Sequence, residues 1–241
     1  MDTVTALAII ALAGLMHATF QLSISMVTLL SSHSIGKKHS GAQTTRLTLG
    51  FLGGTVTMTM LVVSFLTAIL NSLFRAYIPL AVWAVVCGLL IGLGIAIWVF
   101  YYRRQAGTAL WIPRSMARFL STRAKSATSA SESFSLGLTS VIAELIFMIA
   151  PALAAACSLS YLPHRWQLPA LFLYTLIASL GAGIVVVLIG SGHKISDIQR
   201  WREQNKHFLQ FIAGSGFLVL GAFIYANVVA LAAVAGNVTL K

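Results

Sequence analysis

The sequence predicts an all-α membrane protein with six transmembrane helices. Its 241 residues are 58% hydrophobic and only 9% charged, a composition outside the range of soluble globular domains. Several apolar runs reach the roughly 20 residues that a helix needs to cross about 30 Å of hydrocarbon. The runs lack the alternating pattern of barrel strands, so helices that satisfy their own backbone in lipid are expected. The six runs are 4–31, 47–70, 78–102, 134–159, 168–190 and 208–235.

The first run is interpreted as a retained span. No positive charge precedes it, and its apolar stretch is longer than that of a secretory signal peptide.

Basic residues fall almost entirely in alternate loops. The loops that follow the first, third and fifth runs hold 13 Lys and Arg residues, whereas only Arg75, Arg165 and Lys241 lie elsewhere. By the positive-inside rule, these loops are cytoplasmic and both termini are extracytoplasmic, as expected for a multi-pass protein of the cytoplasmic (inner) membrane. The net charge of +11 is then explained without a nucleic-acid partner.

The chain divides into a first half (1–102), a basic linker (103–133) and a second half (134–241). Each half has three runs, so the second half enters the membrane from the opposite face, as in inverted-repeat transporters. Two weak internal matches support a 3+3 inverted repeat. At a shift of 123 positions, Gly14, Leu15, Gln21 and Leu22 fall on Gly137, Leu138, Glu144 and Leu145; at a shift of 127, Leu93, Gly94, Ile97 and Trp98 resemble Leu220, Gly221, Ile224 and Tyr225.

The linker contains a helical pattern over 109–125. Ile112, Met116, Phe119 and Leu120 recur at helical spacing, with arginines mostly on the other side. This pattern predicts a helix on the cytoplasmic surface, against the anionic headgroups of the lipid bilayer. The Ser-rich segment 126–133 is expected to be a flexible hinge.

Glu144 is the one acid deep within an apolar run. An ionised carboxylate near the midplane costs about 2.5 to 3.5 kcal/mol, so it must be neutralised, paired or turned toward a water-filled cavity. Ser140 lies one turn earlier, and Pro151 follows with a missing amide that is expected to open the helix. We therefore expect an ion or proton site here, with a structural interhelical hydrogen bond as the alternative.

The first run carries a polar stripe at a spacing of three or four residues, including His17, Gln21 and Ser25. If the halves are related, Gln21 faces the same central region as Glu144, and His17 lies one turn away. An imidazole and a buried carboxyl group exchange a proton near neutral pH. The alternative for His17 is again an interhelical hydrogen bond.

Small residues mark the second and fifth runs. They permit either close helix packing or the unwound backbone that coordinates substrates at the midplane. The candidates are Gly53, Gly54, Thr55, Ser179, Gly181 and Gly183. In the third run, Gly88 and Gly92 form a GxxxG motif that fits an intramolecular contact or a homodimer face.

Cys87 and Cys157 lie in different runs without CxxC spacing, so we expect neither a disulfide nor a metal site, and no cofactor.

Together these features resemble the lysine-exporter superfamily, which includes cadmium and nickel/cobalt exporters and is related to the membrane domain of thiol:disulfide interchange proteins. The resemblance covers nearly the whole chain: three plus three runs, a long basic linker, a proline in the fourth run (AELIFMIAP) and the ending IQRWREQNKHFLQFIAGSGFLVLGAFIY. It implies export.

The sequence also departs from each branch of that superfamily. Amino-acid exporters usually carry Asn-Pro in the fourth span, where this chain has Ala150 before Pro151. The redox relatives have a cysteine in the first span, which is absent here, and the nickel/cobalt relatives have a His/Asp cluster, whereas His17 has no acid nearby in the sequence. No branch therefore supplies a substrate.

The predicted function is transport, with no enzymatic activity. We expect export of a small solute or ion, coupled to protons through a midplane carboxylate, at a site between the first, second, fourth and fifth spans. Its candidate residues are His17, Gln21, Ser25, Gly53, Gly54, Thr55, Ser140, Glu144, Pro151, Ser179, Gly181 and Gly183. Two alternatives stay open: a membrane thiol-redox or electron relay, and a non-transporting assembly or immunity helper.

Overall fold

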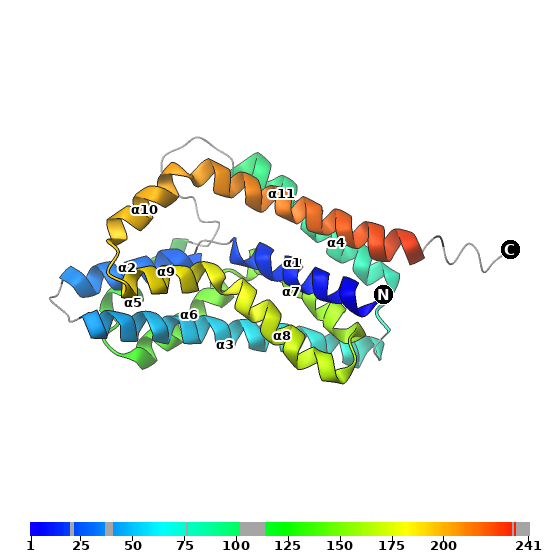
Figure 1. The fold of residues 1–241 in the computed structure, drawn as a ribbon, viewed down its shortest axis with the longest axis horizontal. Coiled ribbons are helices and arrows are strands. Elements are labelled where there is room, and N and C mark those ends of the chain that lie inside the picture. The colour runs from blue at the N-terminus through cyan, green and yellow to red at the C-terminus, as the bar shows by residue number, and fades with distance from the viewer. Residues whose placement is uncertain (20–21, 37–40, 76, 102–113, 233, 235–241) are drawn as a thin grey trace.

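The computed structural model describes residues 1–19, 22–36, 41–75, 77–101, 114–232 and 234, and within these ranges the chain forms helices without strands. This confirms the predicted all-α class. The helices lie side by side along the long axis of the molecule (Figure 1). Gln21 and Ile112 lie outside the described residues.

Three helical segments are long and apolar enough to cross a membrane without interruption, and they match the second, third and sixth predicted runs. They are α3 (Gly41–Phe74), α4 (Leu80–Ala96) continued by the π-helix η1 (Ile97–Tyr101), and α11 (Lys206–Ile224) continued by the π-helix η2 (Tyr225–Ala230). The 34 residues of α3 extend over about 51 Å. In the most apolar 18-residue stretch of α3, only 17% of the residues are buried within the protein. This is compatible with a helix that faces lipid.

Two further apolar stretches are each bent at a single residue. Helices α6 (Ala130–Ala143) and α7 (Leu145–Tyr161) meet at 81°, and helices α8 (His164–Ala178) and α9 (Leu180–Gly190) meet at 57°. Counting each bent pair as one span gives up to five apolar spans among the described residues.

The first predicted run is also interrupted. Helix α1 (Thr3–Ala18) is apolar but has only 16 residues, fewer than the roughly 20 that a membrane crossing needs, and α2 (Leu22–Gly36) follows it. One helix therefore ends at Ala18, and the next begins at Leu22.

The α6–α7 pair runs the length of α3. At one end, the side chain of Gln43, near the start of α3, donates to the Thr128 carbonyl just before α6 (3.5 Å). At the other end, the Tyr161 hydroxyl donates to the Ile78 carbonyl, in the connection between α3 and α4 (3.2 Å). The bent pair therefore traverses the bundle rather than returning to its starting end.

Two short charged helices lie at the end of the bundle where α2 ends and α6 begins: α5 (Arg114–Ser126) and α10 (Ile195–Gln204) (Figure 1). Leu120 and Ala124 of α5 are fully buried against residues of α2, α3, α6 and α9, while Phe119 is 49% exposed. The described part of the predicted linker helix is thus present, and part of its apolar stripe packs on the bundle.

The predicted hinge over 126–133 is shorter in the structure. The Ser129 hydroxyl accepts from the Glu132 amide (3.2 Å), and the Glu132 carboxylate accepts from the Ser129 amide (3.2 Å). This reciprocal capping box starts α6 at Ala130, because it satisfies amides that would otherwise lack partners.

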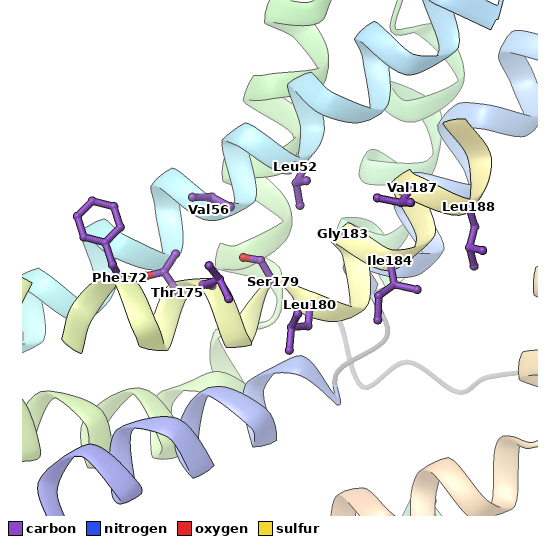
Figure 2. Close-up of a pocket in the computed structure, with 11 residues that line it drawn as sticks. Leu52, Val56, Phe172, Thr175, Ser179, Leu180, Gly183, Ile184, Val187 and Leu188 are labelled. Atoms are coloured by element: carbon purple, nitrogen blue, oxygen red, sulfur yellow. The ribbon is translucent and has the colours of Figure 1, made fainter. Parts of the chain in front are cut away.

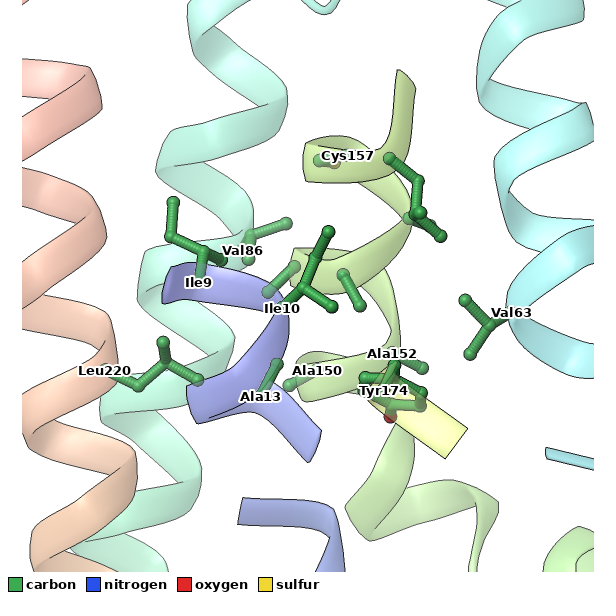
Figure 3. Close-up of a cluster of buried hydrophobic side chains, with 14 of the residues drawn as sticks. Ile9, Ile10, Ala13, Val63, Val86, Ala150, Ala152, Cys157, Tyr174 and Leu220 are labelled. Atoms are coloured by element: carbon green, nitrogen blue, oxygen red, sulfur yellow. The ribbon is translucent and has the colours of Figure 1, made fainter. Parts of the chain in front are cut away.

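Buried hydrophobic side chains form two clusters, and the helix breaks separate them. The large cluster, part of which Figure 3 shows, takes its members mainly from α1, α4, α7, α8, α11 and the second half of α3. The small cluster takes its members from α2, α5, α6, α9 and the first half of α3. In each of the three interrupted segments, one helix (α1, α7 or α8) packs in the large cluster and the other (α2, α6 or α9) contributes to the small cluster. Val141, in the last turn of α6, already belongs to the large cluster.

Glycines allow two pairs of close helix crossings. A Cβ atom at Gly14 would lie 2.9 Å from the Tyr174 carbonyl oxygen of α8, and one at Gly137 would overlap the Phe51 carbonyl oxygen of α3. Between α4 and α11, a Cβ at Gly94 would lie 2.9 Å from the Gly214 carbonyl oxygen. Near the other end of that contact, a Cβ at Gly221 would lie 2.8 Å from Ile91 and 3.5 Å from the Cys87 carbonyl oxygen. The absence of side chains lets these backbones approach.

Candidate functional site

Glu144 lies at the break between α6 and α7, and it is only 4% exposed. Its amide donates to the carbonyl oxygens of Ser140 and Val141 (3.1 and 3.2 Å), which closes the last turn of α6. Its carbonyl accepts from the amides of Phe147 and Met148 (2.9 and 3.1 Å), which opens α7 in a new direction. The backbone of Glu144 therefore joins two helix ends, and its side chain is buried there.

The break at Glu144 precedes Pro151 by seven residues. Pro151 is buried inside α7, and the helix runs through it to Tyr161. The proline therefore lies one to two turns beyond the point where the chain changes direction. Its place in the sequence indicated a disturbed helix but not the position of the bend.

His17 is buried in the last turn of α1 and pairs with Tyr174 of α8. The imidazole Nδ1 and the Tyr174 hydroxyl are 3.1 Å apart, and the ring centroids are 5.9 Å apart. This contact is the interhelical hydrogen bond that the sequence left as an alternative. Sequence reasoning missed Tyr174, although a tyrosine within an apolar run is itself a signal, because a buried phenol usually requires a partner.

The break between α8 and α9 lies next to the end of α1 and the first turns of α2. Ser179 ends α8 and begins α9: its amide donates to Thr175 (3.0 Å), and its carbonyl accepts from Gly183 (2.8 Å). A Cβ at Gly181 would lie 3.1 Å from the Ala18 carbonyl oxygen and 3.0 Å from the Ile24 side chain. Gly181 thus brings the start of α9 against the junction of α1 and α2.

Several predicted hydroxyl ligands bond within their own helices. Thr55 donates to Leu52, and Ser140 donates to Gly137, both at 2.8 Å. Such bonds satisfy the hydroxyls locally and favour slight bending of the helix. Each hydroxyl proton is thus donated within its own helix, and each hydroxyl oxygen is still able to accept a further hydrogen bond.

Gly53 and Gly54 serve close packing. Helix α3 is continuous through both residues, and their Cα positions face Phe134 of α6, whose ring lies 3.6 Å from a Cβ at Gly53 and whose carbonyl would overlap one at Gly54. This geometry favours the packing interpretation over unwound backbone for the second span.

Ser25 lies in α2, on the side of the breaks where the small cluster forms. It accepts a hydrogen bond from the Arg202 guanidinium of α10 (3.3 Å), a tie that the sequence did not predict. Burial lowers the pKa of Arg202 from its ordinary value, and the charge of Glu203 opposes that shift. Even so, an arginine retains its charge at neutral pH.

A groove of about 570 Å³ lies between α3 and the bent α8–α9 pair (Figure 2). Ser179 and Gly183 line it, together with Thr175. The remaining lining residues are hydrophobic: Leu52, Val56, Phe172, Leu176, Leu180, Ile184, Val187 and Leu188.

A second cavity, of about 510 Å³, lies at the opposite end of the bundle from α5 and α10. It is lined by residues from the start of α1, the α3–α4 connection, the end of α7 and the π-helix η2. Trp83, Tyr161 and Asn227 are among them, and the Trp83 and Tyr161 rings lie 6.2 Å apart. We term this cavity the vestibule. Sequence reasoning missed it because its residues come from four distant segments.

Cys87 and Cys157 are both buried as free thiols within the large cluster. Among the described residues, no group of three or more His, Cys, Asp or Glu side chains is arranged to hold a metal ion. Gly88 and Gly92 meet no other atom within 4 Å of their Cβ positions, so their GxxxG motif makes no close intramolecular contact within the described chain.

The chemistry available at the breaks is thus a buried carboxylate at one helix junction and an imidazole–phenol pair beside another. A carboxylate and an imidazole are groups that bind and release protons. Comparisons with protein-family models, with curated proteins and with solved structures found no match to this chain.

Proposed function

We propose that this protein is a six-span transporter, built from two inverted three-span halves, that moves a small solute or ion across the cytoplasmic membrane. The observation that carries the proposal is that three apolar segments are interrupted where the two hydrophobic clusters meet, with Glu144 buried at one of these breaks. Helices interrupted at mid-membrane are the usual means by which transporters present backbone and side-chain ligands to a substrate.

The helix crossings support the inverted repeat. A shift of 123 positions carries the pair Gly14 and Tyr174 onto Gly137 and Phe51, with the halves exchanged. A two-fold axis in the membrane plane requires this exchange, because a contact from the first half to the second must return as a contact from the second half to the first.

The α4–α11 contact supports the same relation. A shift of 127 positions carries the pair Gly94 and Gly214 onto Gly221 and Cys87, again with the halves exchanged. Both of these spans also end in π-helices, η1 and η2, which begin at residues related by almost the same shift. These contacts involve side chains and backbone that no sequence match could reveal.

The charge distribution supports the orientation. Arg46, Arg118, Arg123 and Lys125 belong to the end of the bundle that carries α5 and α10, whereas Arg75 follows α3 at the vestibule end. The positive-inside rule makes the first end cytoplasmic. The exposed cations of α5 are then available to anionic headgroups.

In the proposed mechanism, Glu144 alternates between a protonated state and an ionised or substrate-bound state as access switches between the two faces. Its position between two helix ends lets α6 and α7 move against one another while the carboxylate stays buried. The His17–Tyr174 pair holds a second exchangeable proton at the junction of α1 and α8. The outward direction rests on the resemblance to the lysine-exporter superfamily.

The test is flux in proteoliposomes, with a panel of amino acids, divalent metal ions and lipophilic solutes, each with and without a pH gradient. We expect at least one solute to move faster than in protein-free liposomes, and the pH gradient to change its rate. Absence of flux for the whole panel, together with co-purification of a protein partner, would favour a non-transporting helper. Loss of flux in Cys157→Ser would favour a thiol relay, whereas retention excludes it.

A further inference from the structure

The lining of the vestibule passes from exposed residues to fully buried ones. Asp2 is exposed, and Tyr77 is 76% exposed, so these two residues belong to its rim. Ile78 and Trp83 also line the cavity, yet they are only 2% and 1% exposed. The side chains of Asp2 and Asn227 supply polar partners for water, which an apolar cavity does not offer. The vestibule is therefore a site that water and polar solutes can enter.

Trp83 buries a hydrogen-bond donor that has no acceptor. Among the residues that the structure describes, none accepts a hydrogen bond from its indole Nε1. A buried tryptophan N–H usually finds a partner, and leaving it unpaired costs free energy. Water or a polar solute in contact with the indole removes that cost. The unpaired donor thus favours any arrangement that opens Trp83 to the vestibule.

The buried part of the lining joins the two halves of the chain. Ile78 and Trp83 belong to the first half, and Tyr161 ends α7 in the second. The Tyr161 hydroxyl donates to the Ile78 carbonyl (3.2 Å), and its ring lies 6.2 Å from the Trp83 ring, tilted by 43°. We term Ile78, Trp83 and Tyr161 the floor of the vestibule. Movement of one half against the other at this end has to break the hydrogen bond and separate the two rings.

The opposite end of the bundle carries a matching feature. The shift of 127 positions that relates Gly94 to Gly221 carries Trp83 onto Gln210, near the start of α11. Gln210 is 6% exposed, and its Oε1 has no hydrogen-bond partner within the described chain. Buried polar atoms without a partner are uncommon in folded proteins. Their occurrence at related positions near opposite ends supports a shared role for these positions.

We propose that Trp83 and Tyr161 form the outer gate of the transport path, closed in this structure, and that the vestibule is the entrance to that path. When the gate opens, the hydrogen bond from Tyr161 to Ile78 breaks. Trp83 Nε1 then donates to water or to an acceptor atom of the solute. The inference rests on the proposed transport function, to which it adds the position of one gate and the first polar contact of the solute.

Two native thiols lie one helical turn beyond the floor, toward the interior of the bundle. Cys87 follows Trp83 by four residues on α4, and Cys157 precedes Tyr161 by four residues on α7. Cys87 is 4% exposed and Cys157 is 0% exposed. Opening of the gate brings both thiols within reach of water from the vestibule, so they report on it without any added label.

The test is the rate of thiol labelling in the full-length protein in phosphatidylcholine nanodiscs. The reagent is a sulfonated maleimide, which stays in water and does not enter lipid, and each labelled peptide is quantified by mass spectrometry. Thr5 lines the vestibule, so Thr5→Cys measures access to the cavity itself. We expect Thr5→Cys to react at least tenfold faster than Cys87 or Cys157 of the wild type.

Two tryptophans provide a first matched pair of variants. Trp83→Ala removes most of the floor, and we expect it to accelerate labelling of Cys157 at least tenfold. Trp98 lies in η1, at the other end of the same span, and its indole donates to the Phe211 carbonyl (3.4 Å). We expect Trp98→Ala to leave the labelling of Cys157 unchanged. Equal acceleration by both variants would mean general loosening of the bundle and would overturn the inference.

Two tyrosines provide a second pair, which carries the test if Trp83→Ala does not fold. Tyr161→Phe keeps the ring and removes the hydrogen bond to Ile78. We expect it to accelerate labelling of Cys157 about threefold, the change in an opening equilibrium that one interhelical hydrogen bond of average strength produces. Tyr77→Phe makes the same change at the exposed rim, and we expect it to have no effect.

Two further results would overturn the inference. Labelling of Cys157 in the wild type as fast as that of Thr5→Cys would show that the floor does not close the cavity. Unchanged labelling in both Trp83→Ala and Tyr161→Phe would show that these side chains do not control access, and any flux measured in proteoliposomes would then proceed without this gate. The expected labelling pattern without flux of any solute would instead contradict the transport function, while the opening of the floor would stand.

Discussion

Two helix crossings in this protein share a geometry and differ in chemistry. At one, Gly14 of α1 lies against Tyr174 of α8, and His17 shares a hydrogen bond with the tyrosine hydroxyl (3.1 Å). At the other, Gly137 of α6 lies against Phe51 of α3. The residue related to His17 by the same shift of 123 is Ser140, which donates to the carbonyl of its own helix.

On the proposed repeat, the two crossings are copies of one contact that differ in the ionisable groups they carry. Close backbone packing occurs at both crossings, while the ionisable groups differ: an imidazole lies at the first crossing, and a carboxylate, Glu144, lies about two turns beyond Gly137 at the second. The position related to Glu144 is Gln21, a side chain that does not ionise. On the proposed repeat, the scaffold is symmetric and the chemistry is not.

The largest expected effects come from adding a methyl group at the crossings. Gly137→Ala brings a Cβ into overlap with the Phe51 carbonyl, and we expect it to destabilise the protein by about 3 kcal/mol, the upper part of the range for overpacking. Gly14→Ala meets the Tyr174 carbonyl at 2.9 Å, so a smaller loss of about 1 to 2 kcal/mol is expected. The measurement is thermal unfolding in detergent.

Gly88→Ala is the control for these two variants. Its Cβ meets nothing, so helix propensity alone acts, and this favours alanine by up to about 1 kcal/mol. If all three alanine variants changed stability equally, the crossings would not be the close contacts described here.

A moderate effect is expected from making the first crossing resemble the second. Tyr174→Phe removes the hydroxyl that bonds His17, and interhelical hydrogen bonds in membrane proteins average about 0.6 kcal/mol, with a maximum of about 1.7 kcal/mol. We expect a loss of stability in that range, together with a changed pH dependence of flux. A double-mutant cycle with His17→Phe isolates the pair. Additive losses in that cycle would mean that the two side chains do not interact.

The smallest expected effect is on the pH dependence of stability, and it comes from the N-terminal cap of α1. Asp2 caps α1, and hydrogen bonds from Thr5 lower the pKa of its carboxyl group below the ordinary 3.8. A lowered pKa in the folded protein means that the ionised cap stabilises the fold above that ordinary value, and that this contribution disappears as pH falls through the folded value.

Asp2→Asn keeps a capping oxygen but does not titrate. We therefore expect the unfolding midpoint of the wild type to fall slightly more than that of Asp2→Asn when the pH is lowered from 6 toward 3. Glu132, in the cap of α6, also titrates, because hydrogen bonds from the Thr128 and Ser129 amides lower its pKa. It is unchanged in both proteins, so its contribution cancels when the wild type is compared with Asp2→Asn. Parallel curves for the wild type and Asp2→Asn would exclude a contribution from this cap.

Much of the fold follows from local pattern. Apolar runs of the required length identify helices, and a carboxylate among them must be buried, as Glu144 is. The spacing of Leu120 in the linker predicts a helix with an apolar face, and that face packs on the bundle. These features depend on residues close together in the sequence, which is why the sequence alone predicts them.

Other features depend on residues that only the fold brings together. The bend falls at Glu144 rather than at Pro151, and α7 continues through Pro151 within the large cluster. Tyr174 as the partner of His17, and Arg202 as the partner of Ser25, join residues more than 150 positions apart. The groove and the vestibule likewise arise between elements, and no local pattern encodes them.

The most direct test of the central claim is the flux of Glu144→Gln measured across a range of pH, with Glu132→Gln as a control that removes an exposed acid at the start of α6. The account predicts that Glu144→Gln inserts into the membrane at wild-type levels and has lost transport, while Glu132→Gln keeps it. Full transport by Glu144→Gln at every pH would contradict the account, since the buried carboxylate would then have no part in moving the solute.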